Sequence, residues 1–220
     1  MASARLVSPS PEPARDASRM SRLECMAALA PLITDELVVT NVARTAFEWH
    51  AVLPREGNLY TMGMGLVTPV ALGLALALPG RRVLALDGDG GLLLNLGILA
   101  TVANHPAPNL GSIVFDNESY ASTGGLPTAT AGRTDLAAMA VAAGIASAVT
   151  VRTVDEFQAA AREALAGRGP AMVVAKVSAE TPPVGPKLMD GRENKYRFVR
   201  HIEATEGRTI LRPSVVGRRD

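Results

Sequence analysis

The chain has 220 residues, of which 48% are hydrophobic and 4% aromatic, and its formal net charge is +1. This balanced charge argues against a dedicated nucleic-acid-binding protein, which would carry a large and clustered basic excess. The single cysteine, Cys25, excludes an internal disulfide framework and indicates a reducing compartment such as the cytoplasm. No uninterrupted apolar run has the length of a membrane-spanning helix.

Composition divides the chain into three segments. Residues 1–19 are rich in Pro, Ser, Ala and Arg and have no apolar stretch, so we interpret them as a disordered leader and not as a secretory signal. Residues 20–180 hold the apolar runs and form one predicted domain. Residues 181–220 combine Pro, Gly and many charges, and we expect an extension that packs on a partner or has no fixed packing.

Short apolar runs alternate with longer periodic segments, which predicts strands that alternate with helices. In chain order the predicted elements are a helix at 20–33, strands at 37–40 and 58–62, a helix at 66–78, a strand at 82–87, a helix at 91–104, a strand at 111–115, a helix at 135–143, a strand at 148–151, a helix at 153–167 and a strand at 171–177. Right-handed crossovers then produce an α/β fold, with a parallel sheet and helices on both faces. Ligands of such sheets bind beyond the carboxyl ends of the strands.

The segment Gly88-Asp89-Gly90 follows a predicted strand at the point where the chain turns into a helix. Glycines there allow backbone N–H groups to approach an anion, although Asp89 alone could simply cap the helix. Asn117 follows the next predicted strand, so the two side chains should meet at one edge of the sheet. Together with a backbone carbonyl they would offer oxygen ligands to a hard divalent cation, and a diphosphate would complete the coordination.

Gly88-Asp89-Gly90, followed after 26 residues by Asn117, resembles the thiamine-diphosphate-binding motif of the thiamine-dependent decarboxylases. The segment 58–66 looks like the part of that family that touches the cofactor's thiazolium and aminopyrimidine rings. The strand end at Asp116-Asn117 and the segment 120–127 look most like the sulfopyruvate and phosphonopyruvate decarboxylases. The resemblance covers roughly residues 20–180. It implies the diphosphate-binding domain of that family, with thiamine diphosphate and Mg²⁺ as cofactors.

The resemblance also implies roles for individual residues. Asp89, Asn117 and the backbone carbonyl of Ser119 would be the metal ligands. Met64 would be the apolar wedge beneath the bent cofactor, with ordinary core filling as the alternative, and the carbonyl of Met62 would hold the 4'-amino group. Relatives often carry Gly-Ser where this chain has Met62-Gly63. The other residues implied to contact the cofactor are Gly63, Gly65, Gly88, Gly90, Gly91, Tyr120, Arg44 and Thr45.

The resemblance leads us to expect that the chain lacks the second domain that supplies an activating glutamate in complete enzymes of this family. Glu48, Glu56 and Glu118 are the nearest candidates, but carboxylates on this domain would approach from the diphosphate side. The resemblance thus implies the β-type subunit of a split decarboxylase, paired with a pyrimidine-binding α-type subunit in a hetero-oligomer. Its substrate would be a 2-oxo acid such as sulfopyruvate or phosphonopyruvate, giving an aldehyde and CO2. A subunit of a carboligase similar to acetolactate synthase and a non-catalytic cofactor-binding subunit remain the alternatives.

Overall fold

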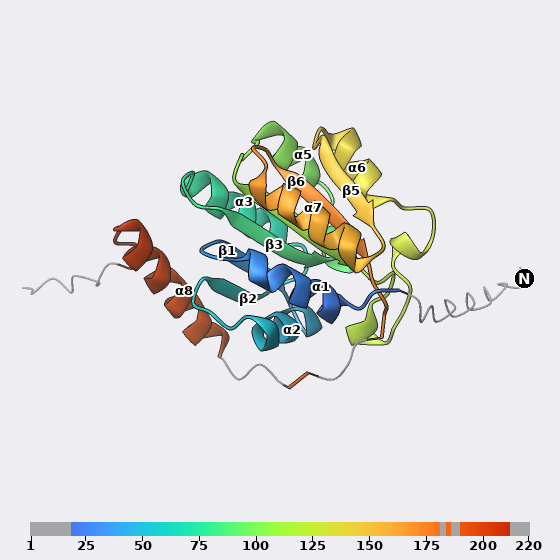
Figure 1. The fold of residues 1–220 in the computed structure, drawn as a ribbon, viewed down its shortest axis with the longest axis horizontal. Coiled ribbons are helices and arrows are strands. Elements are labelled where there is room, and N and C mark those ends of the chain that lie inside the picture. Colours follow the sequence, from blue (N-terminus) through green and yellow to red (C-terminus); the bar gives the residue numbers. More distant parts are fainter. Residues whose placement is uncertain (1–18, 181–183, 186–189, 212–220) are drawn as a thin grey trace, which may run out of the picture.

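A six-stranded sheet forms the centre of the computed structural model, which describes residues 19–180, 184–185 and 190–211 (Figure 1). All strands pair in parallel, in the order β2-β1-β3-β4-β6-β5. The strands are β1 (Leu37–Asn41), β2 (Asn58–Met62), β3 (Val83–Gly88), β4 (Leu110–Asp116), β5 (Ser147–Val151) and β6 (Ala171–Lys176). The predicted α/β fold is confirmed, whereas all of the predicted leader except Arg19 lies outside the described residues.

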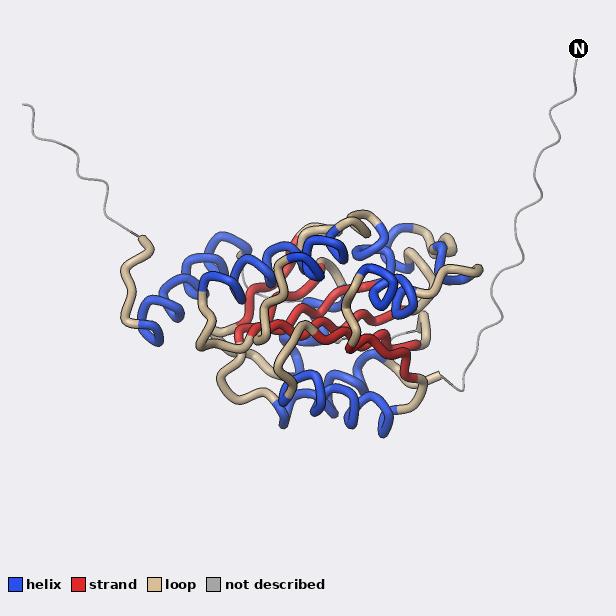
Figure 2. Tube along the Cα trace, turned by 90° about the horizontal axis from the view of Figure 1, so that it is seen from above, coloured by secondary structure: helices blue, strands red, loops and turns tan. Residues whose placement is uncertain are grey.

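Helices cover both faces of this sheet, as the view from above shows (Figure 2). The helices are α1 (Arg22–Leu29), α2 (Arg44–Val52), α3 (Val67–Ala77), α4 (Asp89–Leu93), α5 (Ile98–Asn104), α6 (Leu136–Ala143), α7 (Val154–Ala166) and α8 (Gly191–Glu206). Alternate strand residues face opposite sides, so Leu84 and Leu86 pack with α1, α2 and α7, whereas Val83 and Ala85 pack with α3, α5 and α6. Within the described ranges, every helix is too short or too polar to cross a membrane.

Helix ends lie where local side-chain chemistry predicts them. Thr153 begins α7 with a capping box, in which its hydroxyl accepts from the Glu156 N–H and the Glu156 carboxylate accepts from the Thr153 N–H, both at 3.2 Å. Asp135 caps the start of α6 through the N–H of Ala138. Gly144 ends α6 with a φ of 109°, a conformation that favours glycine.

The prediction of one continuous buried helix at 91–104 is wrong. The segment divides into α4 and α5, and Leu94 between them is 63% exposed. Asn95 follows, and its side-chain amide donates to the carbonyl oxygen of Gly65 at 3.0 Å. Gly97, a poor helix former, stands just before α5. The break thus allows Asn95 to support the turn that follows β2.

We did not predict α2 from the sequence, because its buried face includes polar and charged residues and so lacks a clear apolar periodicity. Glu48 of α2 is fully buried, and Arg22 of α1 donates to both of its carboxylate oxygens, at 2.6 and 2.9 Å. Arg22 is itself 8% exposed in its side chain. The two-point ion pair satisfies a carboxylate that could not otherwise be buried, and it joins α1 to α2.

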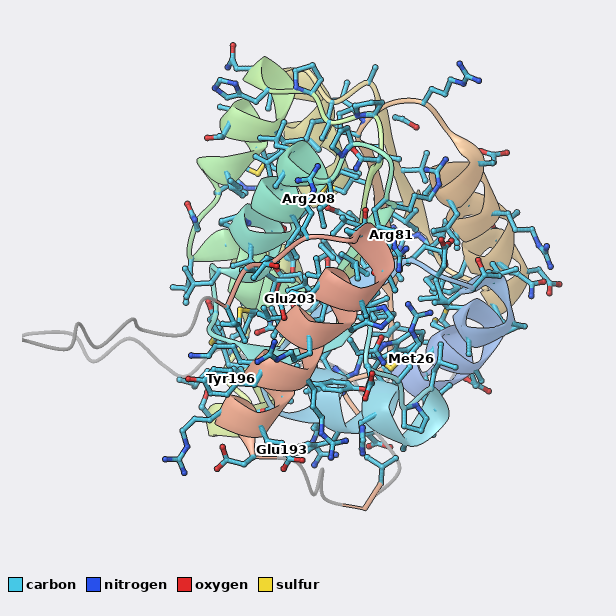
Figure 3. The ribbon with its side chains drawn as sticks, turned by 90° about the vertical axis from the view of Figure 1, so that its left-hand side faces the viewer. Met26, Arg81, Glu193, Tyr196, Glu203 and Arg208 are labelled. Atoms are coloured by element: carbon cyan, nitrogen blue, oxygen red, sulfur yellow. The ribbon has the colours of Figure 1, made fainter. Side chains whose placement is uncertain are left out.

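Helix α8 packs along the β2 edge of the sheet (Figure 3). Phe198 and Ile202 of α8 belong to the same apolar core as α3 and α5. Asn194 accepts from the backbone N–H of Tyr60 at 2.8 Å and donates to the carbonyl of Asn58 at 2.9 Å. Our expectation for residues 181–220 was therefore wrong for α8, because its amide and apolar residues complete the edge strand of its own domain.

Replacing the edge-strand amide tests this packing. We expect Asn194→Ala to lower the free energy of unfolding by about 1–3 kcal/mol, because two buried backbone groups of β2 lose their partner. The matched control is Asn104→Ala, which removes an exposed helical asparagine that bonds only to the carbonyl of Ala100. Urea denaturation of both variants measures the difference, and equal losses would contradict the role given to Asn194.

Candidate functional site

A cleft of about 350 Å³ opens beyond the carboxyl ends of β1, β2, β3 and β4. Parallel pairing places Gly88 opposite Phe115, so β3 and β4 deliver their following residues to the same place. The predicted site residues that line the cleft are Arg44, Thr45, Met64, Gly88, Asp89, Gly90, Gly91, Asn117, Ser119 and Tyr120. Met62, Gly63 and Gly65 belong to the end of β2 and the turn after it, beside the cleft and not in its lining.

The Asn117 amide, the carbonyl oxygen of Ser119 and Oδ1 of Asp89 come together where β3 and β4 end. The Oδ1 atom of Asn117 accepts from the Ser119 N–H at 3.3 Å. The atom at this Oδ1 position of Asn117 lies 2.9 Å from the carbonyl oxygen of Ser119 and 3.1 Å from Oδ1 of Asp89. An amide turned by 180° would place Nδ2 there and donate to both oxygens. The turned amide satisfies both oxygens without an ion, whereas Oδ1 at this position would offer a cation a third oxygen ligand.

The spacing of these oxygens fits a small divalent cation. At Mg–O distances of 2.0–2.1 Å, neighbouring ligands of an octahedron lie about 2.9 Å apart. The distances of 2.9 and 3.1 Å around Asn117 match that edge length, and they equally match hydrogen bonds from a turned amide. In the described ranges no three His, Cys, Asp or Glu side chains come together as a metal cluster. A site with a single carboxylate leaves room for an anionic ligand such as a diphosphate.

Two threonines that the sequence did not predict hold Asp89. The hydroxyl of Thr128 donates to Oδ2 of Asp89 at 2.6 Å, and the hydroxyl of Thr130 lies 3.2 Å from the same oxygen. Burial raises the pKa of Asp89 to about 6, against the lowering effect of the Thr128 hydrogen bond. The only signal in the sequence was the Thr-Ala-Thr pattern at 128–130, which is unremarkable in a loop of small residues.

The predicted glycines leave space for neighbouring side chains. A Cβ on Gly91 would collide with the carboxylate of Asp87 and the amide of Asn41. That amide donates to Oδ1 of Asp87 at 2.8 Å, which joins the ends of β1 and β3 beneath the cleft. Burial raises the pKa of Asp87 to about 7, and the N–H of Gly88 opposes the rise by donating to it. The hydrogen-bonded pair of Asn41 and Asp87 therefore leaves no room for a side chain at position 91.

The loop that follows Ser119 folds back over the cleft. A bridge between Ser119 and Pro127, and a 2.8 Å hydrogen bond from the N–H of Tyr120 to the carbonyl of Leu126, close its base. A Cβ on Gly90 would collide with the Tyr120 ring, so the ring lies directly against the start of α4. Gly124, with a φ of 101°, is one of two consecutive glycines that let the loop turn.

The turn after β2 presents Met64 to the cleft. Met64 is 38% exposed, which is more than an ordinary core methionine, and it lines the cleft wall. Gly65 adopts a φ of 80°, and its carbonyl is fixed by Asn95. The last residue of β2, Met62, pairs with Asn41 of β1.

The opposite wall of the cleft is basic and is formed by the first turn of α2. Arg44 and Thr45 follow Ala43, which has a φ of 57° and provides no side-chain cap. The side chain of Ala43 makes no cap hydrogen bond to this turn, and the start of a helix favours an anion. Arg22 also lines this wall, held in place by Glu48.

None of the three candidate glutamates is available to a ligand in the cleft. Glu48 is fully buried in its ion pair with Arg22. Glu118 accepts from Lys176 and from Arg19, each at 2.9 Å. Glu56 is exposed and precedes β2, so it lies near the amino ends of the strands, whereas the cleft lies beyond their carboxyl ends.

Comparison with known proteins agrees with this geometry. Residues 40–175 match the family model "Thiamine pyrophosphate enzyme, C-terminal TPP binding domain". The chain is 34% identical to sulfopyruvate decarboxylase subunit beta of Methanococcus maripaludis, over 84% of this chain and 98% of that one. It is 37% identical to phosphonopyruvate decarboxylase of Streptomyces viridochromogenes, over 73% of this chain and 41% of the relative.

Solved structures show the same fold. The benzoylformate decarboxylase of Polynucleobacter necessarius aligns with a TM-score of 0.67 at 22% identity, over 80% of this chain and 36% of that one. The chain thus spans nearly all of a separate β subunit but about a third to two fifths of the longer decarboxylases. It belongs to the thiamine pyrophosphate enzyme family, of which it carries the C-terminal TPP binding domain.

Proposed function

We propose that the chain is the β-type subunit of a split thiamine-diphosphate-dependent decarboxylase, acting on a 2-oxo acid such as sulfopyruvate or phosphonopyruvate. The products would be an aldehyde and CO2. The observation that carries the proposal is a cleft in which Asp89, the Ser119 carbonyl and the Asn117 amide come together, while Glu48 and Glu118 are held in ion pairs. Such a cleft suits half of an active site, and the match to nearly the full length of a separate β subunit supports the same view.

In this proposal Asp89, Asn117 and the carbonyl of Ser119 hold Mg²⁺, which neutralises the cofactor's diphosphate. Arg44 and Thr45 contact the diphosphate from the first turn of α2. Gly88, Gly90, Gly91 and Tyr120 enclose it from the other wall, and Gly63 and Gly65 shape the turn beside it. Thiamine diphosphate, when bound, supplies the electron sink for loss of CO2, and the chain's own residues bind and orient it.

Met62 and Met64 orient the reactive end of the cofactor. The carbonyl of Met62 would accept from the 4'-amino group, and Met64 would support the bend between the two rings. The partner is a pyrimidine-binding α-type subunit, which contributes the glutamate that this cleft lacks. Substrate would enter at the junction of the two subunits, where part of the pocket belongs to the partner.

Removing the charge of Asp89 tests the metal site. We expect Asp89→Asn to weaken Mg²⁺-dependent binding of thiamine diphosphate by more than the roughly 10–100-fold that loss of an outer hydrogen-bond partner costs. Calorimetric titration measures the affinity, with the exposed Asp155→Asn of α7 as the matched control. Equal affinities for Asp89→Asn and the unchanged protein would contradict the ligand assignment.

Shortening Met64 tests the role of the bend. We expect Met64→Ala to leave cofactor affinity within about threefold of its normal value and to slow hydrogen–deuterium exchange at the cofactor's C2 in the assembled enzyme, since the bend brings the 4'-nitrogen to that proton. Met139→Ala on α6 is the control, because Met139 has the same 38% exposure away from the cleft. An unchanged exchange rate would contradict the wedge role and indicate that Met64 is an ordinary packing residue.

The need for a partner is tested by assay of the purified chain. With thiamine diphosphate, Mg²⁺ and a panel of 2-oxo acids, we expect no decarboxylation from this chain alone and aldehyde formation once the α-type subunit is added. The reason is that Glu48 and Glu118 are already committed to ion pairs. Robust turnover by the single polypeptide would contradict the half-enzyme proposal, and a carbon–carbon ligation product would favour a carboligase.

A further inference from the structure

A buried hydroxyl network lies behind the proposed metal ligand Asp89. Thr128 and Thr130 are 5% and 3% exposed, and both come from the segment that returns after the loop over the cleft. Their hydroxyls lie 2.8 Å apart and share Oδ2 of Asp89 as a neighbour. The N–H of Thr128 donates to the carbonyl of Glu118 at 3.1 Å, which fixes the segment to the end of β4.

Each hydroxyl can donate a single hydrogen. The short contacts assign the Thr128 hydrogen to Oδ2 of Asp89, at 2.6 Å, and the Thr130 hydrogen to Oδ1 of Asp116, at 2.7 Å. Asp116 is 1% exposed, and its other oxygen accepts from Lys176 at 2.7 Å. Two buried carboxylates are thereby held apart, one with a lysine as its counter-charge and one facing the cleft.

The network engages only one oxygen of Asp89. Oδ2 contacts both threonine hydroxyls, whereas Oδ1 is the atom that lies 3.1 Å from the Asn117 amide. A carboxylate held in this way can present one oxygen to a cation, because rotation to present both would break the hydrogen bond to Thr128. Nothing in the composition of the loop pointed to this arrangement.

We propose that Thr128 and Thr130 are positioning residues that keep Asp89 a one-oxygen ligand and thereby favour Mg²⁺ over Ca²⁺. Mg²⁺ requires near-octahedral geometry with ligands at 2.0–2.1 Å, whereas Ca²⁺ accepts two oxygens of one carboxylate at 2.3–2.6 Å. Thr130 acts on Asp89 indirectly, because its hydroxyl packs against that of Thr128 and donates to Asp116, whose position Lys176 fixes. The inference rests on the proposed function and adds a source of cation selectivity.

The test compares cation preference in hydroxyl-deleted variants of the full chain. Thiamine diphosphate is titrated calorimetrically in saturating Mg²⁺ and, separately, in saturating Ca²⁺. We expect Thr128→Val to lower the Mg²⁺-supported affinity about tenfold or more, the cost typical of losing a ligand's supporting partner. The Ca²⁺-supported affinity should fall less, so the ratio of the two affinities should drop. Thr130→Val should shift the ratio in the same direction.

Three controls separate positioning from loss of structure. Thr128→Ser retains the hydroxyl and should restore the ratio, and Thr101→Val removes an exposed hydroxyl on α5 and should leave it unchanged. Thermal unfolding reports any loss of fold, which would weaken binding with both cations by one factor. An unchanged ratio in Thr128→Val, or equal losses with both cations, would overturn the inference. An unmutated chain that binds with neither cation, even in the presence of the α-type subunit, would instead contradict the proposed cofactor site, and the inference with it.

Discussion

The parallel pairing of β3 with β4 is the constraint on which the rest of the site depends. Gly88 lies opposite Phe115, so the two strands end side by side and bring Asp89 and Asn117 close together. No local interaction within either segment could bring these side chains together. The apolar residues of both strands, packed between helical layers on either face, therefore hold the two proposed metal ligands in place.

The environment of the cleft favours the binding of a cation and an anion together. Asp89 and Asp116 are both buried, and Lys176 balances only the second. On the opposite wall, Arg44 and the first turn of α2 supply positive charge. A metal complex of a diphosphate would complement both walls, because the cation would neutralise Asp89 and the anion would bind at the first turn of α2.

Much of the fold could be predicted from sequence, because apolar runs and helix caps are local signals. The metal-ligand set was predictable in kind from Gly88-Asp89-Gly90 and the spacing to Asn117, and it stays a prediction until a cation is observed. Thr128 and Asn194 could not be found in this way, since their partners lie 39 and 136 residues away in the sequence. Helix α2 was hidden because its most buried charge, Glu48, is satisfied by a residue of α1.

The central claim is that Asp89, Asn117 and Ser119 bind one cation together with the cofactor. Its most direct test is a crystal structure of the chain with thiamine diphosphate and Mn²⁺, which accepts the same oxygen ligands and can be located by anomalous scattering. The account predicts one peak at about 2.1–2.2 Å from Oδ1 of Asp89, Oδ1 of Asn117 and the carbonyl oxygen of Ser119. A cation bound elsewhere, or Asn117 with Nδ2 turned toward Asp89 while cofactor is bound, would contradict it.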